Sequence, residues 1–268
     1  MGLTAKILRH ERLRQLLDFN RNFARGIRVK SPPIFILGCG HSGTSVLLKM
    51  LNMHPHIHAI PFESRAYLKA AWKTRMAEFL WQKNTIAAGK FRWAKKTPSH
   101  VHAIDRILDT HPDASILLII RDGRDVAVSL RKRTGNFAAG VERWVRDNRA
   151  GEAYWDHPRV FRLHYEELVG NFDAVMPRIC DFLGEPYDAS MRNFHKRGLT
   201  LFRSATTQQP PTAAGKHHAQ LRNWQINQQL FNGAGKWKRE MTAEEKAYFK
   251  QHAGQMLIDY GYAADMEW

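Results

Sequence analysis

The chain has 268 residues, 44% of them hydrophobic, which is enough to bury a core and excludes disordered, collagen-like and coiled-coil proteins. Its 41 Lys and Arg residues against 25 acidic residues give a net charge of +16, which favours a polyanionic partner: nucleic acid, acidic lipid, acidic glycan or a phosphorylated cofactor. Two cysteines provide no disulfide framework, and the first 30 residues lack the apolar core of a signal peptide, so we expect a cytoplasmic protein. The longest apolar run, residues 114–120, is too short to cross a bilayer.

Residues 1–30 carry eight Lys or Arg residues against two acidic ones, with apolar side chains at roughly helical spacing. We expect a basic amphipathic helix that packs on the edge of the domain; an arm that contacts a membrane surface or the acceptor is the alternative. Ser31-Pro32-Pro33 ends this segment because proline stops a helix. Residues 31–268 are expected to form a single domain.

From residue 34 onward, short apolar runs alternate with segments of helical periodicity. The runs predict buried strands at residues 34–37, 93–96, 115–120 and 160–163. Helices are expected from near residues 44, 64, 101, 123 and 138, and a capping box of Thr242 and Glu245 opens a C-terminal one. This alternation predicts an α/β domain of three layers, in which a central parallel β-sheet is flanked by helices. Ligands of such sheets bind beyond the carboxyl ends of the strands.

The segment after the first strand, Gly-Cys-Gly-His-Ser-Gly-Thr-Ser at residues 38–45, has the features of an anion-binding loop. Its glycines allow tight turns, and the helix that follows contributes the positive end of its dipole. Ser42, Thr44 and Ser45 add hydroxyl donors. An ordinary glycine-rich turn is the alternative.

The same loop departs from the nucleotide P-loop, G-x-x-x-x-G-K-[ST]. Gly38 and Gly43 have the spacing of its outer glycines, but Thr44 stands where the lysine belongs. A nucleoside triphosphatase needs that lysine against the β- and γ-phosphates, so an ordinary ATPase or GTPase is disfavoured. His41 is the candidate for the missing basic group.

A second anion site is predicted at the end of the strand at residues 115–120. Arg121 follows this strand directly, and Ser129 and Arg133 lie four residues apart on the next helix, so they share a face. The alternative is that the charged residues of the segment 121–125 form surface ion pairs. Two anion sites at strand ends suit a ligand that is phosphorylated at both ends.

Together these motifs resemble the sulfotransferases that depend on 3′-phosphoadenylyl sulfate (PAPS). The loop at residues 41–45 resembles their 5′-phosphosulfate loop, and Arg121 with Ser129 matches their 3′-phosphate motif. Further matches in the family's order are His54-Pro55, Glu63, Lys96-Thr97-Pro98, Tyr165-Glu166-Glu167-Leu168 and Lys236-Trp237. The resemblance spans residues 34–237 and is closest to the branch of glycan and tyrosylprotein sulfotransferases and their bacterial relatives. It implies the P-loop NTPase-like sulfotransferase fold, with PAPS as donor and adenosine 3′,5′-bisphosphate (PAP) as product.

The catalytic candidates are Glu63, Lys96 and His41. Glu63 follows a short apolar stretch that we expect to end beside the phosphate loop, and the resemblance implies that it is the base; the alternative is that its charge complements a helix N-terminus. A carboxylate is favoured because Pro98 stands where cytosolic relatives carry a histidine base. Lys96 would stabilise the leaving group with help from His41, and strand alternation turns Lys95 to the opposite face.

The resemblance further implies that the segment from Ser204 to Trp237 closes over the nucleotide and that Lys236 reaches it. Tyr165, just past a strand, is a weaker cofactor candidate, with a core tyrosine as the alternative. Which of residues 204–235 contact the nucleotide stays open. His54, His56 and His58 alternate, but no acidic or cysteine partner set accompanies them in sequence, so no metal site is expected.

The leading function is therefore sulfuryl transfer from PAPS to an acceptor hydroxyl or amine. A kinase-like P-loop enzyme is the alternative, disfavoured by the absent lysine. A nucleic-acid-binding protein is disfavoured because no motif of that class occurs. The basic charge favours a carbohydrate or acidic glycan as acceptor, and the oligomeric state stays open.

Overall fold

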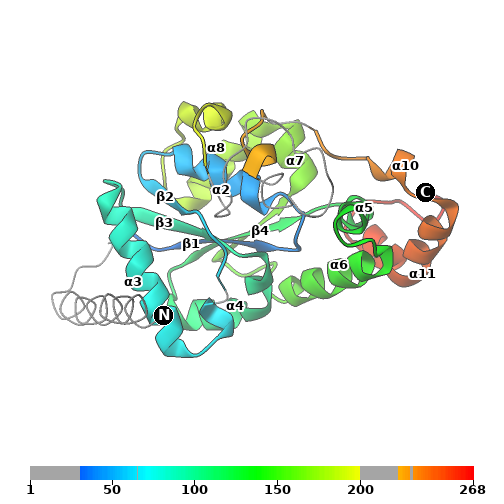
Figure 1. The fold of residues 1–268 in the computed structure, drawn as a ribbon, viewed down its shortest axis with the longest axis horizontal. Helices are drawn as coiled ribbons and strands as arrows, with labels where there is room; N and C mark the ends of the chain where they lie inside the picture. The colour runs from blue at the N-terminus through cyan, green and yellow to red at the C-terminus, as the bar shows by residue number, and fades with distance from the viewer. Residues whose placement is uncertain (1–30, 65, 200–222, 230–231) are drawn as a thin grey trace, which may run out of the picture.

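The structure is a computed structural model that describes residues 31–64, 66–199, 223–229 and 232–268. A central sheet lies between two layers of helices, and a third group of helices packs beyond one end of the sheet (Figure 1). The expectations for residues 1–30, and for most of the segment 204–235, lie outside the described residues.

The sheet has five parallel strands in the order β2-β3-β1-β4-β5. The strands are β1 (Ile34–Gly38), β2 (Ile57–Ile60), β3 (Arg92–Lys96), β4 (Ser115–Ile120) and β5 (Val160–His164). Because β1 lies between β3 and β4, the loops that leave these three strands start side by side at one edge of the sheet. This confirms the α/β class, the predicted strands and the central parallel sheet.

The helices fill the connections between the strands, as right-handed crossovers in parallel sheets require. They are α2 (Thr44–Met53), η1 (Ala66–Leu68), α3 (Ala71–Ala87), η2 (Pro98–Ala103), α4 (Ile104–Thr110), α5 (Gly123–Thr134), α6 (Phe137–Glu152), α7 (Tyr165–Gly170), α8 (Phe172–Leu183), η3 (Ala189–Lys196), α10 (Trp237–Glu240) and α11 (Ala243–Asp259). No helix in the described part of the chain is long and apolar enough to span a membrane.

Strand alternation divides the core into two faces. Ile34 and Ile36 of β1 pack with α2, α7 and α8, whereas Phe35 and Leu37 pack with η2, α3 and α4. A third cluster joins α5, α6 and α11 around Trp144 and Phe249. These clusters fix the helices that follow β1, β3 and β4 on the two faces of the sheet.

The helix starts predicted near residues 44, 123 and 138 are confirmed, whereas the segment near residue 101 is a 3₁₀ helix from Pro98 that continues as α4 from Ile104. The capping box is confirmed, because the Thr242 hydroxyl accepts from the N–H of Glu245 and the Glu245 side chain accepts from the N–H of Thr242. The helix expected near Ser64 begins at Ala71 instead. Tyr67 explains the difference, since its ring packs edge-on against Phe35 at 5.2 Å and the chain makes a 3₁₀ turn there before α3 starts.

Candidate active site

The loop between β1 and α2 needs glycine at both ends. Gly38 has φ +132°, and a Cβ there would lie 2.2 Å from the carbonyl oxygen of Ile119 on β4. Gly43 has φ +91°, and a Cβ there would lie 2.5 Å from the ring of Tyr165. The two glycines thus let the loop turn tightly against β4 and the start of α7.

Polar groups gather inside this loop. Ser42, Thr44 and Ser45 are all buried, and the Ser42 hydroxyl makes no hydrogen bond within the described residues. α2 begins at Thr44 without a side-chain cap, and the first N–H groups of a helix have no intrahelical acceptor. Buried hydroxyls and the N–H groups at a helix N-terminus are groups that bind anions, so the loop keeps the features of the predicted anion site.

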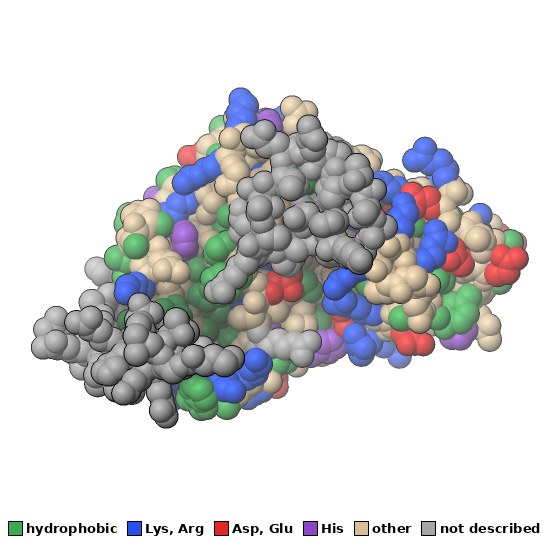
Figure 2. All heavy atoms as spheres, in the orientation of Figure 1, with side chains coloured by type: hydrophobic (Ala, Val, Ile, Leu, Met, Phe, Trp, Pro, Cys, Tyr) green, Lys and Arg blue, Asp and Glu red, His purple; other side chains and the backbone are tan. Residues whose placement is uncertain are grey.

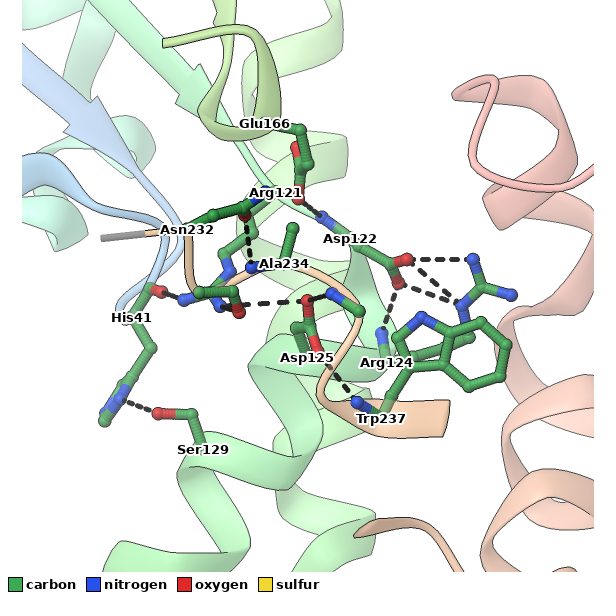
Figure 3. Close-up of polar contacts among 12 residues, drawn as sticks. His41, Arg121, Asp122, Arg124, Asp125, Ser129, Glu166, Asn232, Ala234 and Trp237 are labelled. Atoms are coloured by element: carbon green, nitrogen blue, oxygen red, sulfur yellow. Dashed lines mark hydrogen bonds and ion pairs between the residues drawn. The ribbon is translucent and has the colours of Figure 1, made fainter. Parts of the chain in front are cut away.

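His41 connects this loop to the second predicted anion site. It is a non-glycine residue with φ 73°, a left-handed conformation that costs energy and is often found at functional sites. Its ring Nδ1 shares a 2.8 Å hydrogen bond with the Ser129 hydroxyl on α5, and its carbonyl accepts from Arg121 at 3.0 Å (Figure 3). The residues of the two predicted anion sites therefore adjoin each other, as their places on neighbouring strands predict.

Arg121 stands at the centre of the site. Its guanidinium also donates to the carbonyl of Gly233 at 2.6 Å and lies 4.3 Å from the centre of the Tyr165 ring. The Arg121 Nε is buried and makes no hydrogen bond within the described part of the chain. Arg121 thus joins three segments and keeps one donor that a bound anion could use.

Asp125 positions Lys236, a role that the sequence analysis missed. Its two carboxylate oxygens accept from the N–H groups of Gly235 at 2.8 Å and Trp237 at 3.0 Å (Figure 3). Lys236 lies between these two anchors and lines the same pocket as Arg121. The Arg-Asp-Gly-Arg-Asp sequence predicts a charged site, but it does not indicate that Asp125 binds the backbone of Gly235, 110 residues further along the chain.

The alternative of surface ion pairs is wrong, because the pairs in this segment are buried. Arg124 pairs with Asp122 at 2.8 Å, and its guanidinium lies 3.7 Å from the centre of the Trp237 ring. Both charged residues are buried. Burial raises the pKa of Asp122, although the hydrogen bonds from Arg124 oppose that rise. This pair holds α10 against α5 and leaves Arg121 to face the pocket.

One pocket brings together most of the residues that are predicted to bind the nucleotide. It is lined by His41, Gly43, Ser45, Arg121, Ser129, Tyr165 and Lys236. The position of Arg133 is a correction: its side chain is exposed and does not line the pocket, whereas Lys132 does. Residues 132 and 133 both neighbour Ser129 on the helix surface, and Lys132, which pairs with Glu240 at 2.7 Å, lies at the edge of the pocket.

Glu63 and Lys96 form an ion pair at the carboxyl end of β3. The Lys96 side chain is 3% exposed and the Glu63 side chain 43%, so the carboxylate covers the ammonium from the solvent side. β2 is an edge strand separated from β1 by β3, so the stretch before Glu63 ends beside Lys96 and not beside the phosphate loop as expected. Among the described residues the next helical element, η1, begins at Ala66 and has no acidic residue in its first turn, so the structure does not support the alternative that Glu63 complements a helix N-terminus.

The two lysines of β3 face opposite sides, as strand alternation predicts. Ala94 packs in the core cluster of α2, so Lys96, two residues on, points to the face of the phosphate-loop helix. Lys95 lies on the other face, buried 4.7 Å from the centre of the Phe62 ring and 5.1 Å from that of Trp81. Lys95 makes no hydrogen bond within the described residues.

Lys95 makes stability depend on pH. Burial, with Lys96 adding, lowers the pKa of Lys95 to about 7 from 10.5. Between pH 7 and 10.5 the unfolded chain holds a proton on Lys95 that the folded chain has lost. The free energy of unfolding should therefore increase as pH rises through this range, by up to about 1.4 kcal/mol per pH unit. In urea titrations from pH 7 to pH 9, we expect the free energy of unfolding of the wild type to increase relative to that of Lys95→Met. Parallel stability curves would contradict this assignment.

His54 and His56 do have an acidic partner, which corrects the sequence analysis. Atoms of His54, His56 and Glu185 lie within 4.8 Å of one another, a grouping that could hold a metal ion. However, His54 donates to the carbonyl of Pro186 at 2.9 Å and accepts from the N–H of His56 at 3.2 Å, so both its ring nitrogens are used. Arg92 also pairs with Glu185 at 3.3 Å. The group is therefore a hydrogen-bond network at the amino ends of the strands, away from the phosphate loop.

A phosphate loop and a basic strand end on neighbouring parallel strands define an α/β protein of the P-loop-like class. Two solved structures share this fold: the sulfotransferase domain from the curacin biosynthetic pathway (TM-score 0.58, 15% identity, 84% of this chain and 97% of that chain) and a mouse sulfotransferase complexed with PAP (TM-score 0.52, 18% identity, 84% of each chain). A family model described as "Sulfotransferase family" matches residues 59–189, and one described as "Sulfotransferase domain" matches residues 131–261. Together these two models span residues 59–261 and support a sulfotransferase family for this chain.

A curated relative is protein-tyrosine sulfotransferase A of Caenorhabditis elegans. It is 27% identical, and the match covers 61% of this chain and 52% of the relative. The chain therefore spans about half the length of the curated relative that it matches.

Proposed function

We propose that this protein transfers a sulfuryl group from PAPS to an acceptor hydroxyl or amine. The observation that carries the proposal is the single pocket in which the phosphate loop meets Arg121 and Ser129 through His41. A nucleotide with phosphates at both its 5′ and 3′ ends matches two adjoining anion sites. The mouse sulfotransferase of the same fold is complexed with PAP, which supports PAPS as the donor.

The chemistry of the pocket fits such a nucleotide. Ser42 Oγ and Arg121 Nε are buried donors that make no hydrogen bond in the described part of the chain, and buried unpaired donors are costly unless a ligand or water satisfies them. Residues 41–45 would hold the 5′-phosphosulfate, and Arg121 with Ser129 the 3′-phosphate. Tyr165 and Lys236 line the remaining wall. Arg133 is exposed and has no place in this assignment.

PAPS supplies the activated sulfuryl group, and the chain supplies the base and the cations. Glu63, with its partly exposed carboxylate, would take the proton from the acceptor. Lys96 keeps this carboxylate in position through their ion pair, and its buried ammonium would stabilise the negative charge that develops on the departing phosphate. His41 would assist from the loop that it shares with the nucleotide.

The acceptor is proposed at the level of its chemistry. The named relative is a protein-tyrosine sulfotransferase, which supports a hydroxyl acceptor. The net charge of +16 suits an acidic acceptor, of which an acidic glycan is one kind. Lys and Arg side chains are spread over the visible face of the protein, with acidic side chains among them on the right (Figure 2). A single domain over residues 31–268 and a cytoplasmic location stay predictions.

Nucleotide binding tests this proposal. PAP should raise the melting temperature more than 5′-AMP, because the lost 3′-phosphate contacts should weaken binding about tenfold or more. Arg121→Ala should abolish most of that difference. The matched control is Arg133→Ala, since this arginine is on the neighbouring helix but outside the pocket, and it should keep the difference. Equal stabilisation of the wild type by PAP and 5′-AMP would rule out the 3′-phosphate site.

A further inference from the structure

A buried lysine connects the phosphate-loop helix to a segment near the C-terminal part of the chain. Lys49 of α2 is 1% exposed, and its Nζ donates to Oδ1 of Asn227. The ammonium also lies 5.7 Å from the centre of the Phe194 ring on η3. Burial lowers the pKa of Lys49 to about 8, so the group is still charged at pH 7. A buried ammonium is costly without acceptors, and Asn227 supplies one.

The Asn227 side chain is fixed by four hydrogen bonds. Its Oδ1 accepts from the N–H of Leu199 at 3.0 Å as well as from Lys49. Its Nδ2 donates to the carbonyl oxygens of Leu199 at 3.1 Å and Asn223 at 2.6 Å. A side-chain amide has two donor hydrogens and two acceptor lone pairs, so Asn227 uses all of them. Asn227 therefore holds the backbone at Leu199 and Asn223 together, and Lys49 ties both to α2.

The segment 223–229 that contains Asn227 forms one wall of the nucleotide pocket. It contributes the side chains of Gln225, Ile226, Gln228 and Gln229, next to Phe194 of η3. Ile226 and Phe194 are buried in the core cluster that includes α2. Lys49 and Asn227 are not among the residues that line the pocket, so they act on it through this wall.

The wall and the phosphate loop contact different parts of one ligand. The two anion sites account for the phosphates, whereas the apolar side chains of Ile226 and Phe194 suit the base and the sugar. α2 begins at the phosphate loop, and Lys49 lies five residues after its first residue, about one and a half turns along the helix. The contact between Lys49 and Asn227 therefore sets how far the wall stands from the loop.

We propose that Lys49 and Asn227 are positioning residues for nucleotide binding, which hold the wall for the base and sugar at a fixed distance from the phosphate loop. This inference rests on the proposed function and deepens it. Because neither residue lines the pocket, their loss should weaken binding of the donor without changing the transfer step. The competing explanation is that the charge of Lys49 attracts the phosphates directly.

The test measures dissociation constants of PAP and 5′-AMP for the full chain and for Lys49→Met. Methionine keeps an apolar chain in the buried site but cannot donate to Asn227. Both nucleotides should bind about tenfold more weakly, the size of one lost hydrogen bond to a charged group. The preference for PAP over 5′-AMP should remain, unlike in Arg121→Ala, since the base and sugar are common to both. In transfer assays KM for PAPS should rise while kcat stays near that of the wild type.

The matched control is Lys90→Met. Burial also lowers the pKa of Lys90 to about 8, and its Nζ donates to the carbonyl oxygens of Asn52, His54 and Ile57, near the amino end of β2. Lys90 does not line the pocket, so its replacement should leave both dissociation constants unchanged. Melting curves without ligand show whether each variant is folded, and Lys49→Gln is the second variant if Lys49→Met does not fold.

Asn227→Leu separates positioning from direct attraction by charge. It removes the same contact while Lys49 keeps its ammonium, so both nucleotides should again bind more weakly. The double variant Lys49→Met/Asn227→Leu should bind about as well as the weaker single variant, because the two residues act through one contact.

Three results would overturn the positioning role. The first is unchanged nucleotide affinity in folded Lys49→Met, even with a lower melting temperature, and the second is an equal loss in Lys90→Met. The third is weaker binding in Lys49→Met with normal binding in Asn227→Leu, which would show that the charge of Lys49 acts directly. Failure of the wild type to bind PAP at all would instead refute the proposed function, so the two failures are distinguishable.

Discussion

Replacing Glu63 by Gln is expected to lower kcat by about 10²–10⁴-fold, the usual contribution of a general base, while fold and PAP affinity stay unchanged. The amide is nearly isosteric with the carboxylate and can still accept a hydrogen bond from Lys96, but it cannot take a proton at working pH. The measurement is transfer of labelled sulfate from PAPS to the acceptors of a cell extract, with melting curves and PAP binding as checks.

The control for Glu63→Gln is Glu167→Gln. Glu167 is also a partly exposed carboxylate paired with a cation, Arg178, but it lies on α7 and does not line the nucleotide pocket. Its replacement should leave turnover near that of the wild type. If Glu63→Gln does the same, Glu63 is not the base, and His41 or His100 becomes the candidate. His100 is buried, and burial lowers its pKa to about 4, so it is neutral at working pH but a weak base.

Lys96→Ala is expected to lower kcat by about 10² or more, the loss typical of one positioned electrostatic stabiliser. Lys95→Ala should cost far less activity, because Lys95 faces Phe62 and Trp81 on the opposite side of β3. The adjacent lysine thus serves as the matched control of equal size. The reverse order of effects would show that Lys95 carries the role assigned to Lys96.

The ion pair adds a second readout to these variants. Because Lys96 holds Glu63 in place, the effects of Glu63→Gln and Lys96→Ala should not add in the double variant. A loss in the double variant well below the product of the single losses supports a shared role in one step. Fully multiplicative losses would mean that the two residues act independently.

The parts of the site that the sequence could predict are those coded by neighbouring residues. The strand at Ile34–Gly38 and the loop after it form one continuous pattern of apolar run, glycines and hydroxyls, and so does β4 with Arg121. Parallel strands then bring their carboxyl ends to one edge, which is why His41 and Ser129 meet although 88 residues separate them. The local sequence pattern and the topology of the sheet were therefore sufficient to predict the loop after β1, Arg121 and their proximity.

The missed features depend on partners far apart in the chain or on the roll of a helix. Asp125 and Trp237 are 112 residues apart, and His56 and Glu185 are 129 apart, so no spacing rule pairs them. The strand order that separates β2 from β1 is a property of the whole sheet. Whether Lys132 or Arg133 faces the pocket depends on how α5 packs against α6, because both positions neighbour Ser129 on the helix surface.

The most direct test of the account is a transfer assay run in parallel with two donors, PAPS labelled in its sulfur and ATP labelled in its γ-phosphate. Each is incubated with the protein and the acceptors of a cell extract, and the labelled product is isolated and identified. We predict that sulfur label is transferred by the wild type and lost in Glu63→Gln, and that no label is transferred from ATP. Transfer from ATP without transfer from PAPS would contradict the account and identify a kinase-like enzyme instead.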